Sequence, residues 1–148
     1  MTTTAAAPVF RVHSLAQAVA VLQAAQETRR AVRILLGDYL GWAACAALRD
    51  AALASVPGAR AAWLYDPGGR AGMAALALRQ GAPAVLWPRR DRRHAALASL
   101  AAATGGRVMA RPRIALDLAY SREPLSAAQA LLAPRRRSGA LPPGRPAR

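Results

Sequence analysis

The sequence predicts one α/β domain with a mostly parallel sheet of about five strands alternating with four helices. Short apolar runs alternate with longer stretches of helical periodicity, and turns containing glycine or proline separate them. The length of 148 residues suits a single domain. Hydrophobic residues make up 54% of the chain, which is enough to form a core and argues against global disorder.

The predicted strands are short and apolar. The clearest is residues 31–36 (AVRILL), and the others cover residues 9–12, 60–65, 84–87 and 107–110. Near-continuous apolar runs of this kind are typical of strands buried on both faces of a parallel sheet.

Helical patterns fill the spaces between these strands, at residues 14–30, 41–55, 70–80 and 91–104. Ser14 is a suitable N-cap for the first helix, and Gly81 is the expected residue after the third. This alternation predicts right-handed βαβ units. Two architectures fit: an open Rossmann-like or flavodoxin-like sheet with helices on both faces, and half of a (β/α) barrel.

The chain divides into four parts by composition. We expect a flexible leader at residues 1–8, the α/β domain at 9–113, and an extension at 114–133 with a short helix over 126–133. Residues 134–148 are rich in arginine, proline and glycine and have almost nothing to bury. That composition predicts a disordered basic tail.

The chain is strongly basic, with a formal net charge of +14, and its 21 basic residues are all arginine. Heavy use of arginine, alanine, glycine and proline is typical of a GC-rich codon supply. The charge nevertheless favours encounters with anions such as nucleic acid, phosphorylated metabolites or acidic lipid.

The location predicted from the sequence is the cytoplasm. Cys45 is the only cysteine, so no intramolecular disulfide can form, and this suits a reducing compartment. The N-terminus lacks the pattern of a signal peptide, and no apolar run is long enough to span a membrane. No motif for a nucleotide cofactor and no Cys/His spacing for zinc is present, so we expect neither a cofactor nor a metal.

Polar residues follow the predicted strands, and ligands of parallel α/β sheets bind at the carboxyl ends of the strands. These positions are His13, Asp38, Asp66, Arg70, Arg89, Arg90, Arg111 and Arg113. The strongest element is the segment from Asp66 to Gly72, because glycines before a helix let backbone N–H groups approach an anion. The predicted anion site therefore contains Gly68, Gly69, Arg70, Arg89 and Arg90.

Two further groupings are weaker candidates. His13 could act as a general base if Asp38 or Asp66 oriented it. Arginines near residue 90 and in the tail could bind nucleic acid, namely Arg92, Arg93, Arg135, Arg136 and Arg137. No RNA-binding aromatic motif and no clear helix-turn-helix supports this second grouping.

Residues 31–87 resemble the early strands of class II fructose-bisphosphate aldolase-type (β/α) barrels. Residues 32–36 followed by Gly37 are similar to the second-strand segment of that family, and residues 64–68 (LYDPG) stand where the family has an Asp-His-Gly signature. The resemblance implies a half-barrel with Asp66 at the position of the catalytic aspartate. Pro67 replaces the metal-binding histidine, which argues against aldolase activity. The chain also resembles small uncharacterised α/β proteins of GC-rich bacteria, for which no activity follows.

We therefore expect a non-enzymatic α/β domain that binds a small anion or a protein partner at the carboxyl edge of its sheet. A homodimer is the assembly that we consider for it. A nucleic-acid-associated basic protein and a degenerate aldolase-like lyase centred on Asp66 and His13 are the alternatives.

Overall fold

The computed structural model describes residues 7–37 and 39–134. Asp38, most of the predicted leader and the tail with Arg135, Arg136 and Arg137 lie outside the described residues. The six strands are β1 (Val9–Arg11), β2 (Val32–Leu36), β3 (Ala61–Tyr65), β4 (Ala84–Leu86), β5 (Arg107–Met109) and β6 (Leu116–Asp117). The five helices are α1 (Leu15–Thr28), α2 (Trp42–Ser55), α3 (Ala71–Arg79), α4 (His94–Thr104) and α5 (Pro124–Leu132).

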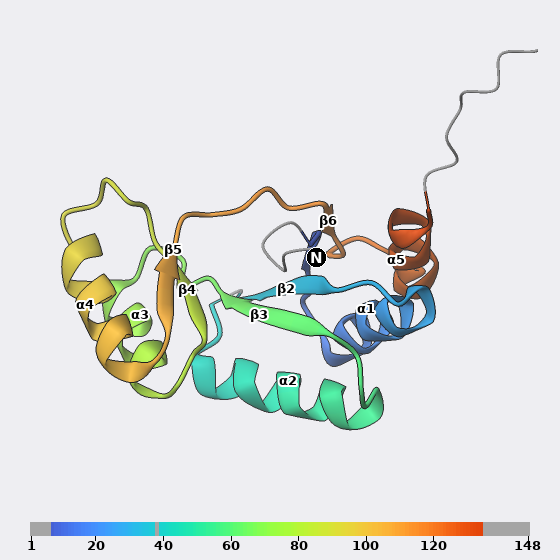
Figure 1. Ribbon diagram of the computed structural model, residues 1–148, viewed down its shortest axis with the longest axis horizontal. Helices are drawn as coiled ribbons and strands as arrows, with labels where there is room; N and C mark the ends of the chain where they lie inside the picture. Colours follow the sequence, from blue (N-terminus) through green and yellow to red (C-terminus); the bar gives the residue numbers. More distant parts are fainter. Residues whose placement is uncertain (1–6, 38, 135–148) are drawn as a thin grey trace, which may run out of the picture.

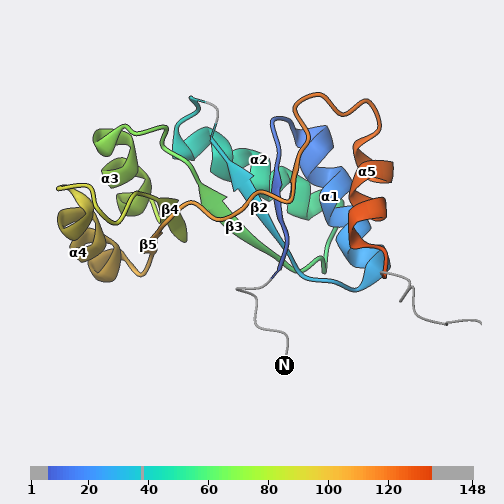
Figure 2. The same ribbon diagram turned by 90° about the horizontal axis from the view of Figure 1, so that it is seen from above.

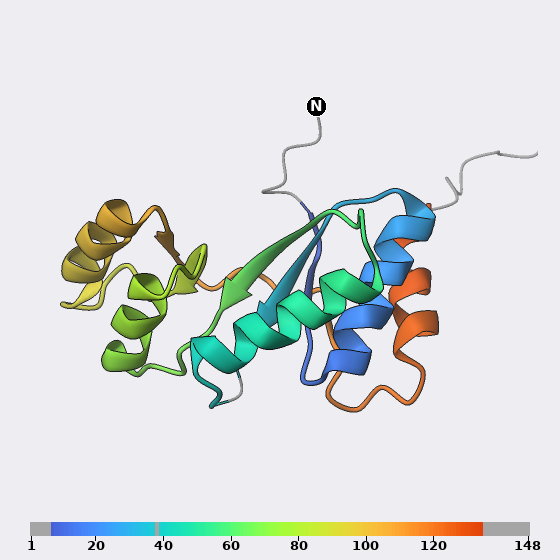
Figure 3. The same ribbon diagram turned by 90° about the horizontal axis from the view of Figure 1, so that it is seen from below.

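All six strands form one parallel sheet in the order β5-β4-β3-β2-β1-β6. From β1 to β5, each strand lies next to the strand that precedes it in the sequence, always in the same direction across the sheet. Right-handed crossovers in a constant direction place every connecting helix on the same face, and the helices do lie on one side of the sheet (Figures 1 and 3). The predicted α/β fold with a parallel sheet is therefore confirmed. Helices on one face of β1 to β5 are the arrangement of a half-barrel, and β6, which pairs with β1 at the other edge, departs from it.

The connection from β5 to β6 reverses this direction and crosses the opposite face of the sheet. This return segment, residues 110–115, passes over β4, β3, β2 and β1 (Figures 1 and 2). Five strand spacings of about 4.8 Å make about 24 Å, which so short a segment spans only when nearly extended. Reversing both the direction and the face preserves right-handedness, so the same rule that places the helices also places the return segment.

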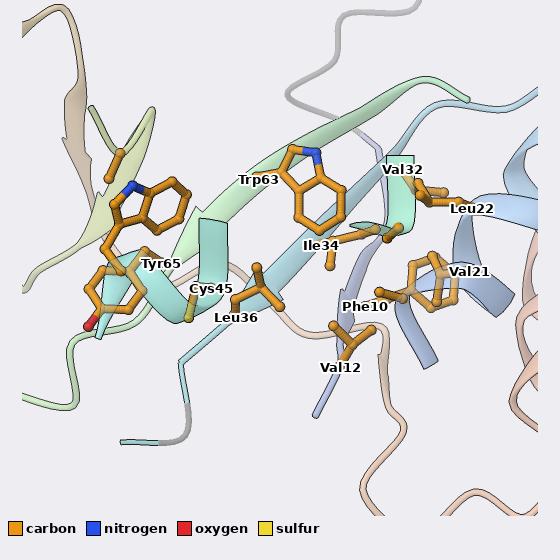
Figure 4. Packing of buried hydrophobic residues seen from close by; sticks show 14 of the residues in the cluster. Phe10, Val12, Val21, Leu22, Val32, Ile34, Leu36, Cys45, Trp63 and Tyr65 are labelled. Atoms are coloured by element: carbon orange, nitrogen blue, oxygen red, sulfur yellow. The ribbon is translucent and has the colours of Figure 1, made fainter. Parts of the chain in front are cut away.

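The main core lies between the sheet and the helices. Alternate strand residues point into it, including Phe10, Ile34 and Tyr65, and α1 contributes Val21 and Leu22 (Figure 4). Cys45 is buried in this core, as the sequence predicts for a small apolar side chain.

The opposite face of the sheet has its own smaller core. The strand residues that point there are Val9, Leu35, Leu64, Ala84 and Leu86, and they are all buried. Met109 and Ile114 pack against them. A helix contributes no residue to this cluster within the described part of the chain, so Ile114 of the return segment takes the place of a second helical layer.

Local sequence signals explain the start of α1 and the end of α3. The Ser14 side chain accepts a hydrogen bond from the backbone N–H of Gln17 at 3.2 Å, which confirms the predicted N-cap of α1. Gly81 has a φ of +90°, the left-handed conformation expected of the residue that ends α3. The prediction for α4 was wrong at its start: Asp91 forms a turn with Arg93, and the helix begins at His94.

The predicted extension supplies both β6 and α5. The short helix expected over 126–133 is α5, at Pro124–Leu132, and it packs along α1. A hydrogen bond of 2.6 Å from Gln129 Nε2 to Glu27 Oε2 links the two helices. Among the described helices, none has the length and apolar character needed to cross a bilayer.

Candidate functional site at the carboxyl ends of the strands

A cavity of 330 Å³ lies where β3, β4 and β5 end. We call it the carboxyl-end pocket. Its lining residues come from the three segments that follow these strands, and they are Asp66, Gly69, Leu86, Trp87, Pro88, Ala110 and Arg111. The pocket is thus at the edge where ligands of parallel α/β sheets bind.

Close backbone packing between β2 and β3 positions Asp66. Its N–H donates to the carbonyl of Leu36 at 2.8 Å, which extends the parallel ladder by one residue. Gly37 stands opposite, where a Cβ would come within 2.6 Å of the Asp66 carbonyl oxygen. Glycine at this position therefore allows the two strand ends to approach each other.

The Asp66 carboxylate is buried, and both of its oxygens are engaged. Oδ1 accepts a hydrogen bond from the Gly68 N–H at 2.9 Å, and Oδ2 accepts one from Arg111 Nη2. The Asp66 side chain is 10% exposed, whereas that of Arg111 is 53% exposed. The ion pair therefore neutralises the buried acid and leaves part of the Arg111 guanidinium facing solvent and the pocket.

The turn at Gly68 and Gly69 leads into the N-terminus of α3. Both glycines have positive φ, 63° and 76°, and Gly69 lines the pocket. Arg70 instead lies over the Tyr39 ring, 5.7 Å from its centroid, and its Nε donates to the carbonyl of Pro67 at 3.3 Å. Of the residues predicted to bind an anion, Gly69 lines the pocket and Gly68 supports Asp66, while Arg70 does not line it.

Arg89 and Arg90 follow Pro88 in an exposed turn and do not line the pocket. Arg93 is held by Asp91 through bonds of 3.1 and 3.3 Å, and it lies 5.1 Å above the Trp87 ring. Hydrogen bonds from the Arg93 side chain and backbone hold the pKa of the Asp91 carboxyl well below its usual value. Arg93 is therefore held within the fold by Asp91, whereas Arg89, Arg90 and Arg92 are the exposed members of this group that have no such ion pair with any described residue.

Asp66 bonds to Gly68 and Arg111 and not to His13, and Asp38, the other predicted partner of His13, lies outside the described residues. The Nε2 atom of His13 lies 2.6 Å from Oδ1 of Asp117 in β6, a strand that the sequence analysis did not predict. Burial acts to raise the pKa of Asp117, but hydrogen bonds from His13 and the Ala119 N–H outweigh it, so the pKa is lowered. The partner was missed because β6 is two residues long and carries no apolar run.

Arg113 was predicted at the carboxyl edge, and the structure places it at the other end of the sheet. The return segment carries the chain back toward the amino ends of the strands, where Arg113 lines a different cavity with Arg30 and Arg33. Arg111 is two residues earlier and stays at the carboxyl edge, as predicted. Within residues 7–37 and 39–134, no three His, Cys, Asp or Glu side chains gather closely enough to hold a metal ion.

Comparison with known proteins supports the fold. No family model and no curated protein matches the chain. Among solved structures, it is similar to a "putative fructose-1,6-biphosphate aldolase from Coccidioides immitis", with a TM-score of 0.57 and 20% identity. The match covers 71% of this chain and 40% of that one, so the chain spans less than half the length of its structural neighbour. The resemblance to early strands of an aldolase-type barrel is thus confirmed at the level of the fold.

Proposed function

We propose that the chain is a non-enzymatic binding domain for a small anion, such as a sugar phosphate, at the carboxyl-end pocket. The observation that carries this proposal is the half-exposed Arg111, fixed by Asp66 at the wall of a 330 Å³ cavity. A guanidinium that is held on one side and open on the other is preorganised to bind phosphate or carboxylate.

The backbone adds a second anion-binding element. The glycine turn leaves open space around Gly68, Gly69 and Gly72, so a ligand meets no side chain there. The N–H groups in the first turn of α3 have no partner within the helix, and the helix dipole favours negative charge at this end. Gly69 lines the pocket together with Arg111, so the backbone of this turn would contribute to binding the anion.

The lining favours binding over catalysis. Among the described residues, the pocket contains one carboxyl group, and this group is already bonded to Arg111 and Gly68. A general acid–base reaction needs a proton-transferring group within reach of the substrate, and His13 is bonded to Asp117 instead. These contacts support the lyase alternative less well than a binding role, although the fold is shared with an aldolase-type barrel.

Calorimetric titration of the full chain with glucose 6-phosphate tests the proposal. Arg111→Lys keeps the charge but loses the planar fork, so we expect binding to weaken about tenfold. Arg79→Lys, the same substitution in the last turn of α3 and away from Gly69, is the matched control and should bind like the parent. Equal affinity of the Arg111→Lys variant and the parent would show that the anion does not bind in this pocket. If the chain binds a protein partner and does not bind phosphate, the anion proposal is wrong and the carboxyl edge is a protein-docking surface.

A nucleic-acid role is the second candidate, and the exposed group Arg89, Arg90 and Arg92 favours it. Phosphate contacts make the binding constant fall linearly with salt on a logarithmic scale, with a slope of about −0.9 per contact. The variant R89Q/R90Q/R92Q should make this salt dependence shallower for duplex DNA, with the magnitude of the slope smaller by about 2 to 3. R49Q/R79Q/R122Q, which changes the net charge equally at residues that line neither the carboxyl-end pocket nor the cavity at Arg113, is the control. The same loss in both variants would mean that total charge, and not this loop, governs binding.

A further inference from the structure

We propose that a second cavity, at the amino ends of the strands, binds a small molecule carrying at least two phosphate groups. This amino-end pocket has a volume of 690 Å³ and lies at the opposite end of the sheet from the proposed anion site. Its polar lining consists of Arg30, Arg33 and Arg113, and the remaining lining is apolar. The inference is independent of the function proposed above, because the two pockets share no residue.

The three guanidinium groups reach the pocket from separate parts of the chain. Arg30 follows α1, Arg33 lies in β2, and Arg113 belongs to the return segment. The crossing of the helix-free face by residues 110–115 is thus what adds Arg113 to the other two (Figure 2). A helical connection on the usual face would have placed it elsewhere.

Each arginine retains donors for a ligand. Arg33 Nε donates to the carbonyl of Ala7 at 2.9 Å, and Arg30 Nη1 donates to the carbonyl of Leu132 at 3.1 Å. These bonds fix the two guanidinium groups but use one of the five N–H donors of each. Arg113 makes no hydrogen bond to any residue of the described part of the chain.

No carboxylate balances this charge within the described residues. The pocket lining contains no Asp or Glu, and Glu27, the acid nearest in sequence to Arg30, is bonded to Gln129. Burial, together with the positive charge of Arg107, lowers the pKa of Arg33. A smaller neighbouring cavity, of 150 Å³, also contains Arg30 in its lining, together with Arg29 and Arg60. Clustered, unpaired cations of this kind repel one another until an anion binds.

The dimensions and lining point to a small multivalent phosphate. Three guanidinium groups match the charge of a diphosphate better than that of a single phosphate, and each can bind phosphate oxygens in bidentate fashion. The volume falls within the range of about 300 to 1,000 Å³ that is usual for small-molecule sites. The apolar side chains of Pro8, Val9 and Leu131 offer a surface for the organic part of an organic diphosphate.

Calorimetric titration of the full chain with inorganic pyrophosphate, and then with ADP, tests this inference at low ionic strength. Arg113→Gln and Arg33→Gln should each weaken pyrophosphate binding about tenfold or more. Arg122→Gln, an exposed arginine in the loop before α5, is the control of equal charge change and should bind like the parent. Arg33 also holds Ala7, so Arg113→Gln keeps the test valid if Arg33→Gln unfolds.

Three results would overturn the inference: no heat of binding with either probe, equal weakening in all three variants, or binding to a duplex oligonucleotide with no response to pyrophosphate. The last result would assign the arginines to a nucleic-acid backbone. Arg111→Lys should leave pyrophosphate binding intact. Failure at one pocket is therefore distinguishable from failure at the other.

Discussion

The two ends of the sheet carry opposite electrostatic arrangements. At the carboxyl ends, three carboxylates each have a partner: Asp66 with Arg111, Asp91 with Arg93, and Asp117 with His13. At the amino ends, six arginines gather without an ion pair among the described residues: Arg29, Arg30, Arg33, Arg60, Arg107 and Arg113. Of the described residues, these six arginines thus form a cluster without acids at the amino ends, and the three paired carboxylates lie at the carboxyl ends.

This difference teaches that the arginine content does not have a single explanation. The use of arginine in place of lysine is a property of the whole composition, but it does not determine where the acids lie. Acids that pair with arginine at the carboxyl edge stabilise the fold, whereas unpaired arginines at the amino edge oppose it and favour anion binding. Removing a charge should therefore have opposite effects on stability at the two ends.

The largest effect is expected from Asp66→Ala. The substitution removes the acceptor of the Gly68 N–H and leaves Arg111 without its partner, which should cost about 2 to 3 kcal/mol of unfolding free energy. Asp50→Ala is the matched control, because its ion pair with Arg49 is exposed, and it should change stability by less than about 0.5 kcal/mol. Urea denaturation followed by circular dichroism measures both. Equal stability of the two variants would contradict a structural role for the Asp66–Arg111 pair.

Most of the sheet could be predicted from the sequence because its strands are continuous apolar runs with clear turn residues between them. The run at residues 31–36, for example, gave β2 within one residue. The rule on carboxyl ends of strands likewise placed Asp66 and Arg111 at one edge. The pairing of these two residues could not be predicted, because it depends on the direction in which the return segment leaves β5.

The remaining differences have the same physical origin. β6 has one apolar residue and gains its place by hydrogen bonds to β1, so nothing in its local pattern marks it as a strand. The partner of His13 and the position of Arg113 both depend on β6 and on the path leading to it. The partner of His13 and the position of Arg113 are therefore determined by non-local hydrogen bonds and by the handedness of the crossover, which local sequence periodicity does not encode.

A somewhat smaller effect is expected from Gly37→Ala, which tests the close packing beneath the carboxyl-end pocket. The new methyl group would lie 2.6 Å from the Asp66 carbonyl oxygen, a backbone atom that cannot rotate away. Overpacking of this kind costs about 2 kcal/mol and should displace Asp66. Gly72→Ala is the control, because nothing lies within 4 Å of its added methyl group, and it should be neutral or stabilising. Thermal denaturation and calorimetric titration with glucose 6-phosphate measure the two consequences. An unchanged melting temperature in Gly37→Ala would contradict the close approach.

Acid titration probes the third carboxylate of the carboxyl end. The pKa of Asp117 is lower in the folded chain than in the unfolded one, so its ionised form stabilises the fold above its unfolded pKa of about 3.9. That contribution is lost as the pH falls through the folded pKa. The Asp117 side chain is 47% exposed, so solvent screening limits the effect to less than about 1 kcal/mol. Asp117→Asn should flatten the stability profile below about pH 4. Identical acid profiles for parent and Asp117→Asn would refute this contribution.

The smallest effect, and the one of opposite sign, is expected at the amino end. Arg107 lies at the start of β5, and its charge acts on Arg33, so Arg107→Gln should relieve repulsion and raise stability by about 0.5 kcal/mol at low salt. Added salt screens the same repulsion, so the gain should shrink between about 10 mM and about 500 mM salt. Urea midpoints at both concentrations measure the change, with Arg92→Gln as the exposed control at the carboxyl end. A gain that persists at high salt would point to packing and not to charge, and a loss of stability would show that the arginines of the amino end are not in mutual repulsion.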